Sequence, residues 1–369
     1  MIIQSMDLEN FRNYKTLHLE FDEGTNILYG NNAQGKTNIL EAVYLSGTTK
    51  SHKGSKDRDV IAFHQEESHI RTIIRRNDIS YRIDMHLKKN KTKGIAINGI
   101  PIKRASELFG IVNYVFFSPE DLNIIKNGPA ERRRFMDLEL CQLDKSYLFD
   151  LTNYNRALNQ RNRLLKDLWA RPELKDTLFL WDEKLAEFGS KIIKRRMEFM
   201  DHLCPIVERI HGQLSGEKEK CRLVYEPNIS VNAFREQLKR NLEKDMKFKL
   251  TSIGPHRDDL LFQIGGIDIR RFGSQGQQRT CALSLKLAEI ELVKEMIHDT
   301  PILLLDDVLS ELDSNRQNYL LNSINQIQTL ITCTGLDDFV NHRFEIDRVF
   351  QVVDGVVYTY CLLYTSRCV

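Results

Sequence analysis

The chain has 369 residues, of which 41% are hydrophobic and 28% are charged, the composition of an ordinary soluble globular protein. Its 53 Lys and Arg residues nearly balance its 51 Asp and Glu residues, so the total charge does not indicate a nucleic-acid binder and any basic surface must be local. No stretch approaches the roughly 18 apolar residues of a membrane-spanning helix. The N-terminus lacks the pattern of a secretory signal, and the seven cysteines form no C-x-x-C pair. We therefore expect a cytoplasmic protein with reduced thiols, and the cysteine spacing suggests no metal site.

The first part of the chain is predicted to form strands. Apolar and polar residues alternate over 17–21 and again over 79–85, as they do on a half-buried strand. Apolar runs at 26–29 and 110–117 predict two more strands. Asn98-Gly99 predicts a tight hairpin turn, because both residue types tolerate positive φ.

The pattern becomes helical after Phe117. Ser118 is a predicted helix cap, with Pro119 at the first helical position and Asp121 three residues after the cap. Residues 120–215 are rich in charge and carry apolar residues at spacings of three and four, which favours helices. No heptad persists over many repeats, so we do not expect a long coiled coil.

Strands return in the last third of the chain. The segment 302–305 has no polar alternation, which is typical of a strand buried on both faces. The predicted elements are a strand at 259–264, a strand at 267–271, a helix at 275–298, a strand at 302–305, and strands at 329–333 and 347–353.

The order of these elements predicts an α/β head that is interrupted by a helical insertion. We assign residues 1–119 to the first part of the head, 120–245 to the helical arm, and 246–357 to the second part of the head. The last segment, 358–369, shows no packing pattern. We treat it as a tail that is either disordered or a cloning read-through.

Residues 30–38 read GNNAQGKTN and match the phosphate-loop pattern G-x-x-x-x-G-K-[ST]. A predicted strand leads into this loop and a helix opens after it, so backbone N–H groups and the helix dipole face a bound anion. Lys36 is predicted to bridge the β- and γ-phosphates of ATP, and Thr37 to offer its hydroxyl to Mg²⁺. The residues predicted to bind the nucleotide are Gly30, Asn31, Asn32, Ala33, Gln34, Gly35, Lys36, Thr37 and Asn38.

Two adjacent carboxylates, Asp306 and Asp307, end the apolar segment ILLLDD. A phosphate loop needs such groups for Mg²⁺ and for the attacking water. We predict that Asp306 holds Mg²⁺ and that Asp307 orients and deprotonates the water, with Lys36 as the other catalytic residue. The alternative is that one of them caps the next helix. Asp306 follows Lys36 by 270 residues, which indicates a substantial insertion between the two motifs.

A third motif, FGSQGQQRT at 272–280, is predicted to open the helix that precedes the Asp pair. Its exposed N–H groups would form a second anion site. The order of phosphate loop, helix start and Asp pair is that of the ATP-binding cassette class. In that class the helix start completes the ATP site of a partner subunit. The residues predicted to do so here are Ser274, Gln275, Gly276 and Gln277.

Several weaker features of the sequence have more than one interpretation. The Arg132–Arg134 run and the KKNKTK segment at 88–93 could contact DNA phosphates, or could be solvated faces. Neither includes aromatic residues, so base stacking is not indicated. His256 and Arg257 lie in a Gly-Pro turn that approaches the nucleotide or a dimer interface, or is purely structural.

The motifs together resemble the RecF family, SMC-like DNA-repair ATPases of the cassette class. The matching segments are LENFRNY at 8–14, GNNAQGKTN at 30–38, KSHKGSKDRDVI at 50–61, FFSPEDL at 116–122, GPAERRRFMD at 128–137, GPHRDDL at 254–260, the Ser274 motif and PILLLDDVLSELD at 301–313. They occur in the family's order and span residues 1–357.

This resemblance implies a cassette ATPase head with an inserted helical arm and no long coiled coil. It implies an ATP-induced homodimer that binds double-stranded, single-stranded and gapped junction DNA. It also implies partnership with RecO and RecR in loading RecA on single-stranded DNA, a role in gap repair, replication restart and the SOS response, and weak DNA-dependent ATP hydrolysis. Ser310–Asp313 resemble the loop that couples the two ATP sites. The switch His of cassette transporters is replaced here by Thr332 and Thr334.

Two other functions fit part of the pattern. The motor subunit of a membrane transporter shares the motif order, but the middle insertion, Asn38 and the second Asp argue against it. A small-molecule kinase shares the phosphate loop, but the separation of the motifs and the Ser274 helix start disfavour it. Binding to DNA and not to a membrane partner or a small acceptor discriminates among the three.

Overall fold

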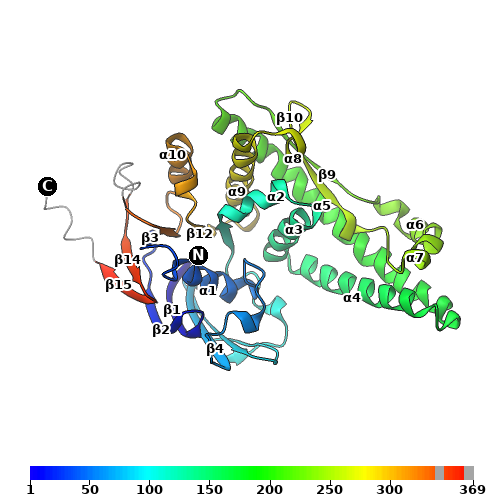
Figure 1. Ribbon diagram of the computed structural model, residues 1–369, viewed down its shortest axis with the longest axis horizontal. Coiled ribbons are helices and arrows are strands. Elements are labelled where there is room, and N and C mark those ends of the chain that lie inside the picture. Colours follow the sequence, from blue (N-terminus) through cyan, green and yellow to red (C-terminus); the bar gives the residue numbers. More distant parts are fainter. Residues whose placement is uncertain (337–344, 361–369) are drawn as a thin grey trace. The chain divides into compact units, whose positions relative to one another are not determined.

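The computed structural model describes residues 1–336 and 345–360 (Figure 1). These form two compact units, one of Met1–Asp121 with Glu289–Val369 and the other of Leu122–Ala288. Unit 1 is therefore discontinuous in sequence, and unit 2 is inserted into it. Among the described residues, no helix combines the length and the apolar character needed to cross a membrane.

The first sheet of unit 1 has the strand order β15-β14-β3-β13-β12-β8. Its strands are β3 (Thr25–Tyr29), β8 (Tyr114–Phe117), β12 (Ile302–Asp306), β13 (Thr329–Cys333), β14 (Arg348–Val353) and β15 (Val356–Tyr360). All neighbours are parallel except β15, which pairs antiparallel with β14 at the edge. Since parallel strands share a direction, the carboxyl ends of β3, β13 and β12 meet at one edge of the sheet.

The second sheet of unit 1 is antiparallel, with the order β2-β1-β4-β5-β6-β7. Its strands are β1 (Ile2–Phe11), β2 (Tyr14–Glu20), β4 (Glu67–Arg76), β5 (Ile79–Lys88), β6 (Gly94–Ile97) and β7 (Ile100–Pro101). Asn98 and Gly99 join β6 to β7 with φ values of 52° and 82°, so the predicted hairpin turn is confirmed.

The helices of unit 1 include α1 (Lys36–Thr48) and α10 (Ser314–Ser323). From Ile39 to Thr48 every residue of α1 is buried. The hydrophobic core joins side chains of α1 with residues of both sheets. This packing fixes the start of α1, where the phosphate loop ends.

Unit 2 is mainly helical. Its helices are α2 (Leu122–Lys126), α3 (Pro129–Leu143), α4 (Lys145–Asp167), α5 (Leu178–Ser215), α6 (Phe234–Arg240), α7 (Leu242–Phe248), α8 (Ile269–Phe272) and most of α9 (Gln275–Ile297). A small antiparallel sheet in the order β11-β10-β9 completes it, with β9 (Cys221–Glu226), β10 (Asp259–Ile264) and β11 (Ile267–Asp268). The long helices α4 and α5 pack against each other, and the described residues include no long coiled coil.

Two buried arginines tie the helices of unit 2 together. Arg161 of α4 pairs with Asp182 of α5 at 2.6 Å and with Asp245 of α7 at 2.7 Å. Arg196 of α5 pairs with Asp137 of α3 at 2.7 Å and with Asp258 at 2.8 Å. Removing one partner of such a pair leaves a buried charge uncompensated, which is strongly destabilising.

The structure differs from the predicted elements in three places. The strand expected at 267–271 ends after two residues, because the Asp268 side chain accepts a hydrogen bond from Arg270 N at 2.9 Å and caps α8. The strand expected at 110–117 begins only at Tyr114. Residues 358–360, predicted as part of the tail, continue β15, while 361–369 lie outside the described residues.

The second domain boundary also differs from the predicted one. The first break in the chain lies at 121/122, close to the predicted 119/120. The second lies at 288/289 rather than 245/246. One physical reason is that β10 (Asp259–Ile264) pairs along its whole length with β9, which places this strand with the helical unit. The domain assignment itself stays a prediction.

Candidate nucleotide site

The phosphate loop lies in unit 1 between β3 and α1, as predicted. Gly30 has φ 151° and Gly35 has φ 111°, a backbone region that L side chains rarely adopt. A Cβ at Gly30 would lie 2.3 Å from Val352 O, and one at Gly35 would lie 2.5 Å from Asn13 Nδ2. Both positions therefore require glycine, because the backbone has a positive φ and because nearby atoms of the same chain leave no room for a Cβ.

Lys36 is buried and bent back over the loop. Its Nζ donates to Gly30 O at 2.6 Å and to Asn31 O at 2.8 Å. Burial lowers the pKa of Lys36, while the charges of Asp307, Cys333 and Asp306 act in the opposite direction. The ammonium group is thus held beside the loop's backbone, where an incoming phosphate would meet it.

The first two predicted motifs meet at Thr37 and Asp306. The hydroxyl of Thr37 donates to Asp306 Oδ1 at 2.7 Å across 269 residues of sequence. Both groups offer oxygen donors, which Mg²⁺ prefers, and they already converge on one place. The donor set therefore fits a Mg²⁺ ion, and Thr37 and Asp306 are the residues that would hold it.

Thr332 contacts both residues of the Asp pair, a role that the sequence alone left unassigned. Its Oγ1 donates to Asp306 Oδ1 at 2.7 Å and accepts from Asp307 N at 3.0 Å. Thr332 stands opposite Asp306 in the pairing of β13 with β12. The signal that could have found it is this register, because residues opposite each other on parallel strands leave the sheet at the same edge.

Asp307 turns out of the sheet with φ 52°. Ser310 Oγ donates to Asp307 O at 2.9 Å and lies 3.3 Å from its Oδ1. Asp313, in the same predicted coupling loop, caps α10 by accepting from Arg316 N at 3.1 Å. Asp313, and neither Asp306 nor Asp307, therefore caps the next α-helix.

Asn13 and Arg12 support the site from the loop after β1. Asn13 Nδ2 donates to Gln34 O at 3.1 Å, and its Oδ1 accepts from Asn38 Nδ2 at 2.8 Å. Arg12 makes two 2.8 Å bonds to the buried carboxylate of Glu41 on α1. Sequence reasoning quoted this segment only as part of a motif and gave neither residue a role.

The comparisons with known proteins agree with this geometry. The family model described as the RecF/RecN/SMC N terminal domain matches residues 2–357. The DNA replication and repair protein RecF of Agathobacter rectalis is 64% identical over 357 residues, which cover 97% of this chain and 99% of that protein. RecF of Lachnoclostridium phytofermentans is 62% identical over 357 residues with the same coverage. The chain belongs to the RecF family.

Solved structures confirm the predicted fold class. A structure described as the recombination mediator protein RecF-ATP in the RecFOR pathway matches with a TM-score of 0.91 at 39% identity, over 97% of both chains. An Smc head bound to the C-winged helix domain of ScpA matches with a TM-score of 0.60 at 16% identity, over 100% of both chains. The second match shows the fold alone, which is the SMC-like, ABC-type ATPase head.

The third predicted motif of this RecF-family chain lies in unit 2. Ser274 and Gln277 form a reciprocal cap at the start of α9, because Gln277 N donates to Ser274 Oγ at 3.2 Å and Ser274 N donates to Gln277 Oε1 at 2.9 Å. Ser274, Gln275 and Gly276 are exposed. The helix start is therefore preformed and open to solvent on the chain itself.

The Arg132–Arg134 run is not a uniform basic surface. Arg132 is 2% exposed and pairs with Asp259 at 2.5 Å, so it lies in the core of unit 2. Arg133 donates to Asp258 O at 2.7 Å, and Arg134 is exposed with Glu131 at 3.9 Å. The proposal that this run contacts DNA phosphates is wrong for Arg132, because a buried ion pair takes its charge.

The KKNKTK segment carries less free charge than its sequence suggests. Lys88 pairs with Glu67 and Lys89 with Glu66, each at 3.1 Å. Lys93 pairs with Asp57 at 2.7 Å and donates to Thr49 O at 2.5 Å. Local acidic neighbours therefore neutralise much of this segment.

His256 has a structural place in unit 2. Its Nε2 lies 3.1 Å from Thr251 O, which can only accept, so Nε2 carries the proton. Its Nδ1, 2.6 Å from the Tyr154 hydroxyl, then accepts from it. Burial lowers the pKa of His256 to about 4. These contacts favour a structural role for the turn over a role at the nucleotide or at a dimer interface.

The folded state should become less stable as the pH falls, because His256 is buried in its neutral form. Its folded pKa of about 4 lies below its ordinary 6.5, so the unfolded chain binds the proton first as the pH drops. The contribution is complete above pH 6.5 and is lost between pH 6.5 and 4, by about 1–2 kcal/mol at pH 5. His256→Gln supplies one donor and one acceptor without titrating. We expect this variant to lose less stability than wild type between pH 7.5 and pH 5 in urea unfolding, and equal losses would contradict the assignment.

Gly35→Ala should disable the phosphate loop without unfolding the chain. The new Cβ meets Asn13 and Tyr14 in a left-handed backbone, a conformation that costs about 1–2 kcal/mol for an L residue before any clash. We expect binding of a fluorescent ATP analogue to weaken at least about tenfold. Gly128→Ala is the control, because nothing lies within 4 Å of its Cβ position. Unchanged nucleotide affinity in the Gly35 variant would contradict the role of this loop.

Proposed function

We propose that this RecF-family chain is an ATP-driven clamp on DNA. Two copies close head to tail when the phosphate loop holds Mg-ATP, and slow, DNA-dependent hydrolysis lets them separate. The observation that carries the proposal is the contact of Thr37 with Asp306 beside Lys36. It brings the phosphate loop together with the carboxylate that we propose holds Mg²⁺.

The residues of the loop have distinct tasks in this proposal. Lys36 exchanges its bonds to Gly30 O and Asn31 O for the β- and γ-phosphate oxygens. Thr37 and Asp306 hold Mg²⁺, which neutralises phosphate charge when bound. The backbone of residues 30–38 and the start of α1 bind the phosphates through N–H groups. The RecF structure described with ATP, at 39% identity, supports nucleotide binding by this fold.

Asp307 is the proposed general base. Its backbone is fixed by Thr332 and its carboxylate lies beside Ser310, so it can orient a water toward the γ-phosphate and accept its proton. Thr332 is a positioning residue, because it acts through Asp306 and Asp307. Hydrolysis in this arrangement serves as a switch that resets the clamp.

The exposed cap of α9 supports the dimer. Ser274–Gln277 present a helix N-terminus to solvent, where an anion is favoured. We propose that this surface meets the γ-phosphate of ATP held by a second copy. Each ATP then joins two chains, and loss of the γ-phosphate releases them.

Family membership supports a proposal for the cellular role. We propose that the clamp binds duplex, single-stranded and gapped junction DNA in the cytoplasm. With RecO and RecR it would help to load RecA during recombinational repair, replication restart and the SOS response. The matching structure is described as a mediator in the RecFOR pathway, which supports RecO and RecR as partners. Nothing in the chain favours a small acceptor or a membrane partner over this role.

Two variants test the clamp by opposite effects on dimer lifetime. Light scattering should show wild type shifting from monomer to dimer with Mg-ATP. Lys36→Met should stay monomeric, because it loses the phosphate contact. Asp307→Asn should form dimers that last at least about a hundredfold longer, since general-base catalysis contributes about that factor or more. Asp176→Asn, the same change at an exposed site, is the control. Asp307→Asn dimers that separate as fast as wild type would exclude the general-base role.

Salt dependence tests how DNA is held. We expect ATP-dependent binding to a gapped duplex, followed by fluorescence anisotropy, to weaken steeply between low and high salt. Each phosphate neutralised contributes roughly 0.9 to the log-log slope for a duplex. Affinity should depend on the gap and little on base sequence. Binding that barely changes with salt would contradict backbone contacts, and the absence of binding with ATP would contradict the clamp.

A further inference from the structure

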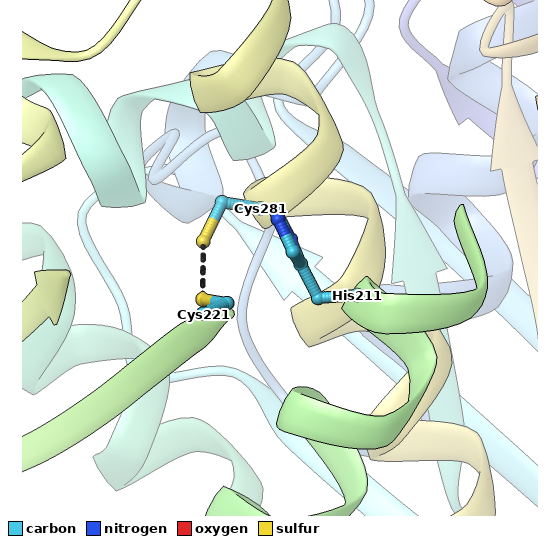
Figure 2. A group of neighbouring side chains, drawn as sticks. All are labelled: His211, Cys221 and Cys281. Atoms are coloured by element: carbon cyan, nitrogen blue, oxygen red, sulfur yellow. Dashed lines mark hydrogen bonds between the residues drawn. The ribbon is translucent and has the colours of Figure 1, made fainter. Parts of the chain in front are cut away.

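Three buried side chains with metal-binding atoms meet inside unit 2 (Figure 2). His211 comes from the last turns of α5, Cys221 is the first residue of β9, and Cys281 lies in α9. All three are 0% exposed. Cys281 is 60 residues from Cys221 in the sequence, so the fold brings it to the other two.

The distances suit a single bound ion. The two Sγ atoms are 3.2 Å apart, and a nitrogen of His211 lies within 4.8 Å of both. A tetrahedral zinc ion, with Zn–S near 2.3 Å and Zn–N near 2.0 Å, holds its ligand atoms roughly 3.5–4 Å from one another. Small side-chain movements therefore suffice to place all three atoms around one centre.

Ser284 prepares the histidine for such a role. Its hydroxyl donates to Thr280 O at 2.7 Å, so its lone pairs face His211 Nδ1 at 3.4 Å. With Nδ1 donating to Ser284, Nε2 would offer its lone pair to an ion in place of its contact with Glu219. Metal-binding histidines characteristically donate their second ring N–H to a nearby oxygen in this way.

A carboxylate stands at the edge of the cluster. Glu219 Oε2 lies 3.3 Å from His211 Nε2. Its other oxygen accepts from Gln277 Nε2 at 2.8 Å. Glu219 lies outside the group of three whose donor atoms are within 4.8 Å of one another, so its carboxylate must move toward the two cysteines to complete a set of four donors. Its bond to Gln277 connects the cluster to the cap of α9.

We propose that His211, Cys221 and Cys281 bind a zinc ion, with Glu219 as the fourth ligand. Zinc accepts thiolate, imidazole and carboxylate together in tetrahedral geometry. The ion would join α5, β9 and α9 and would fix the carboxylate that holds Gln277. The site is independent of ATP, so its failure would leave the clamp proposal intact.

The first test measures bound metal. We expect the untagged protein, expressed with added zinc and dialysed against a weak chelator, to carry one zinc per chain by elemental mass spectrometry. Cys221→Ser and Cys281→Ser should lose it. Cys141→Ser is the matched control, a buried cysteine of the same unit outside the cluster, and should retain it. Zinc that stays at wild-type level in both cluster variants would overturn the proposal.

The second test uses wild-type protein and so does not depend on a variant that folds. Cobalt added to metal-free protein should give the intense visible bands of a tetrahedral site and a sulfur-to-metal band in the near ultraviolet. Glu219→Gln should keep the sulfur band and bind at least about tenfold more weakly. Weak bands of octahedral cobalt without a sulfur band would overturn the proposal. So would thiol counting under denaturing conditions that finds Cys221 and Cys281 joined in a disulfide.

Discussion

The hydrogen bond between Thr37 and Asp306 is the constraint on which the candidate site depends. It joins the first turn of α1 to the end of β12, two segments that are neighbours only because β3, β13 and β12 run parallel side by side. Thr332 on the middle strand bonds to the same carboxylate. The start of α1 and the ends of β12 and β13 thus share one oxygen cluster. The position of each element in the sheet decides whether a phosphate and a metal ion can be held together.

The parts of the fold that the sequence predicted are those with local chemistry. The phosphate loop, the Asn98-Gly99 turn, the buried strand β12 and the helix α9 each follow from residues close together in the chain. The buried role of Arg132 and the positioning role of Thr332 could not be predicted in this way. Both depend on pairing with residues far along the sequence, Asp259 and Asp306. A run of three arginines suggests an exposed basic surface, and only the ion pair of Arg132 with Asp259 shows that its first residue is buried.

The cysteines illustrate the same limit. The sequence suggested no metal site, since the seven residues are scattered and no spacing matches a known motif. In the fold, Cys221 and Cys281 are in contact and His211 lies beside them. Spacing rules detect ligands that share a turn or a hairpin. They do not detect ligands that a helix, a strand and a second helix supply separately.

The discontinuity of unit 1 has a consequence for the order of events during synthesis. β3 is flanked in its sheet by β13 and β14, both from the last part of the chain. All of unit 2 is synthesised before β13 and β14, although the phosphate loop lies near the start of the chain. A nascent chain can therefore complete its helical unit while its central sheet is open and its strand edges are unpaired. The strands that flank β3, and with them the sheet edge that carries the candidate nucleotide site, are therefore completed last.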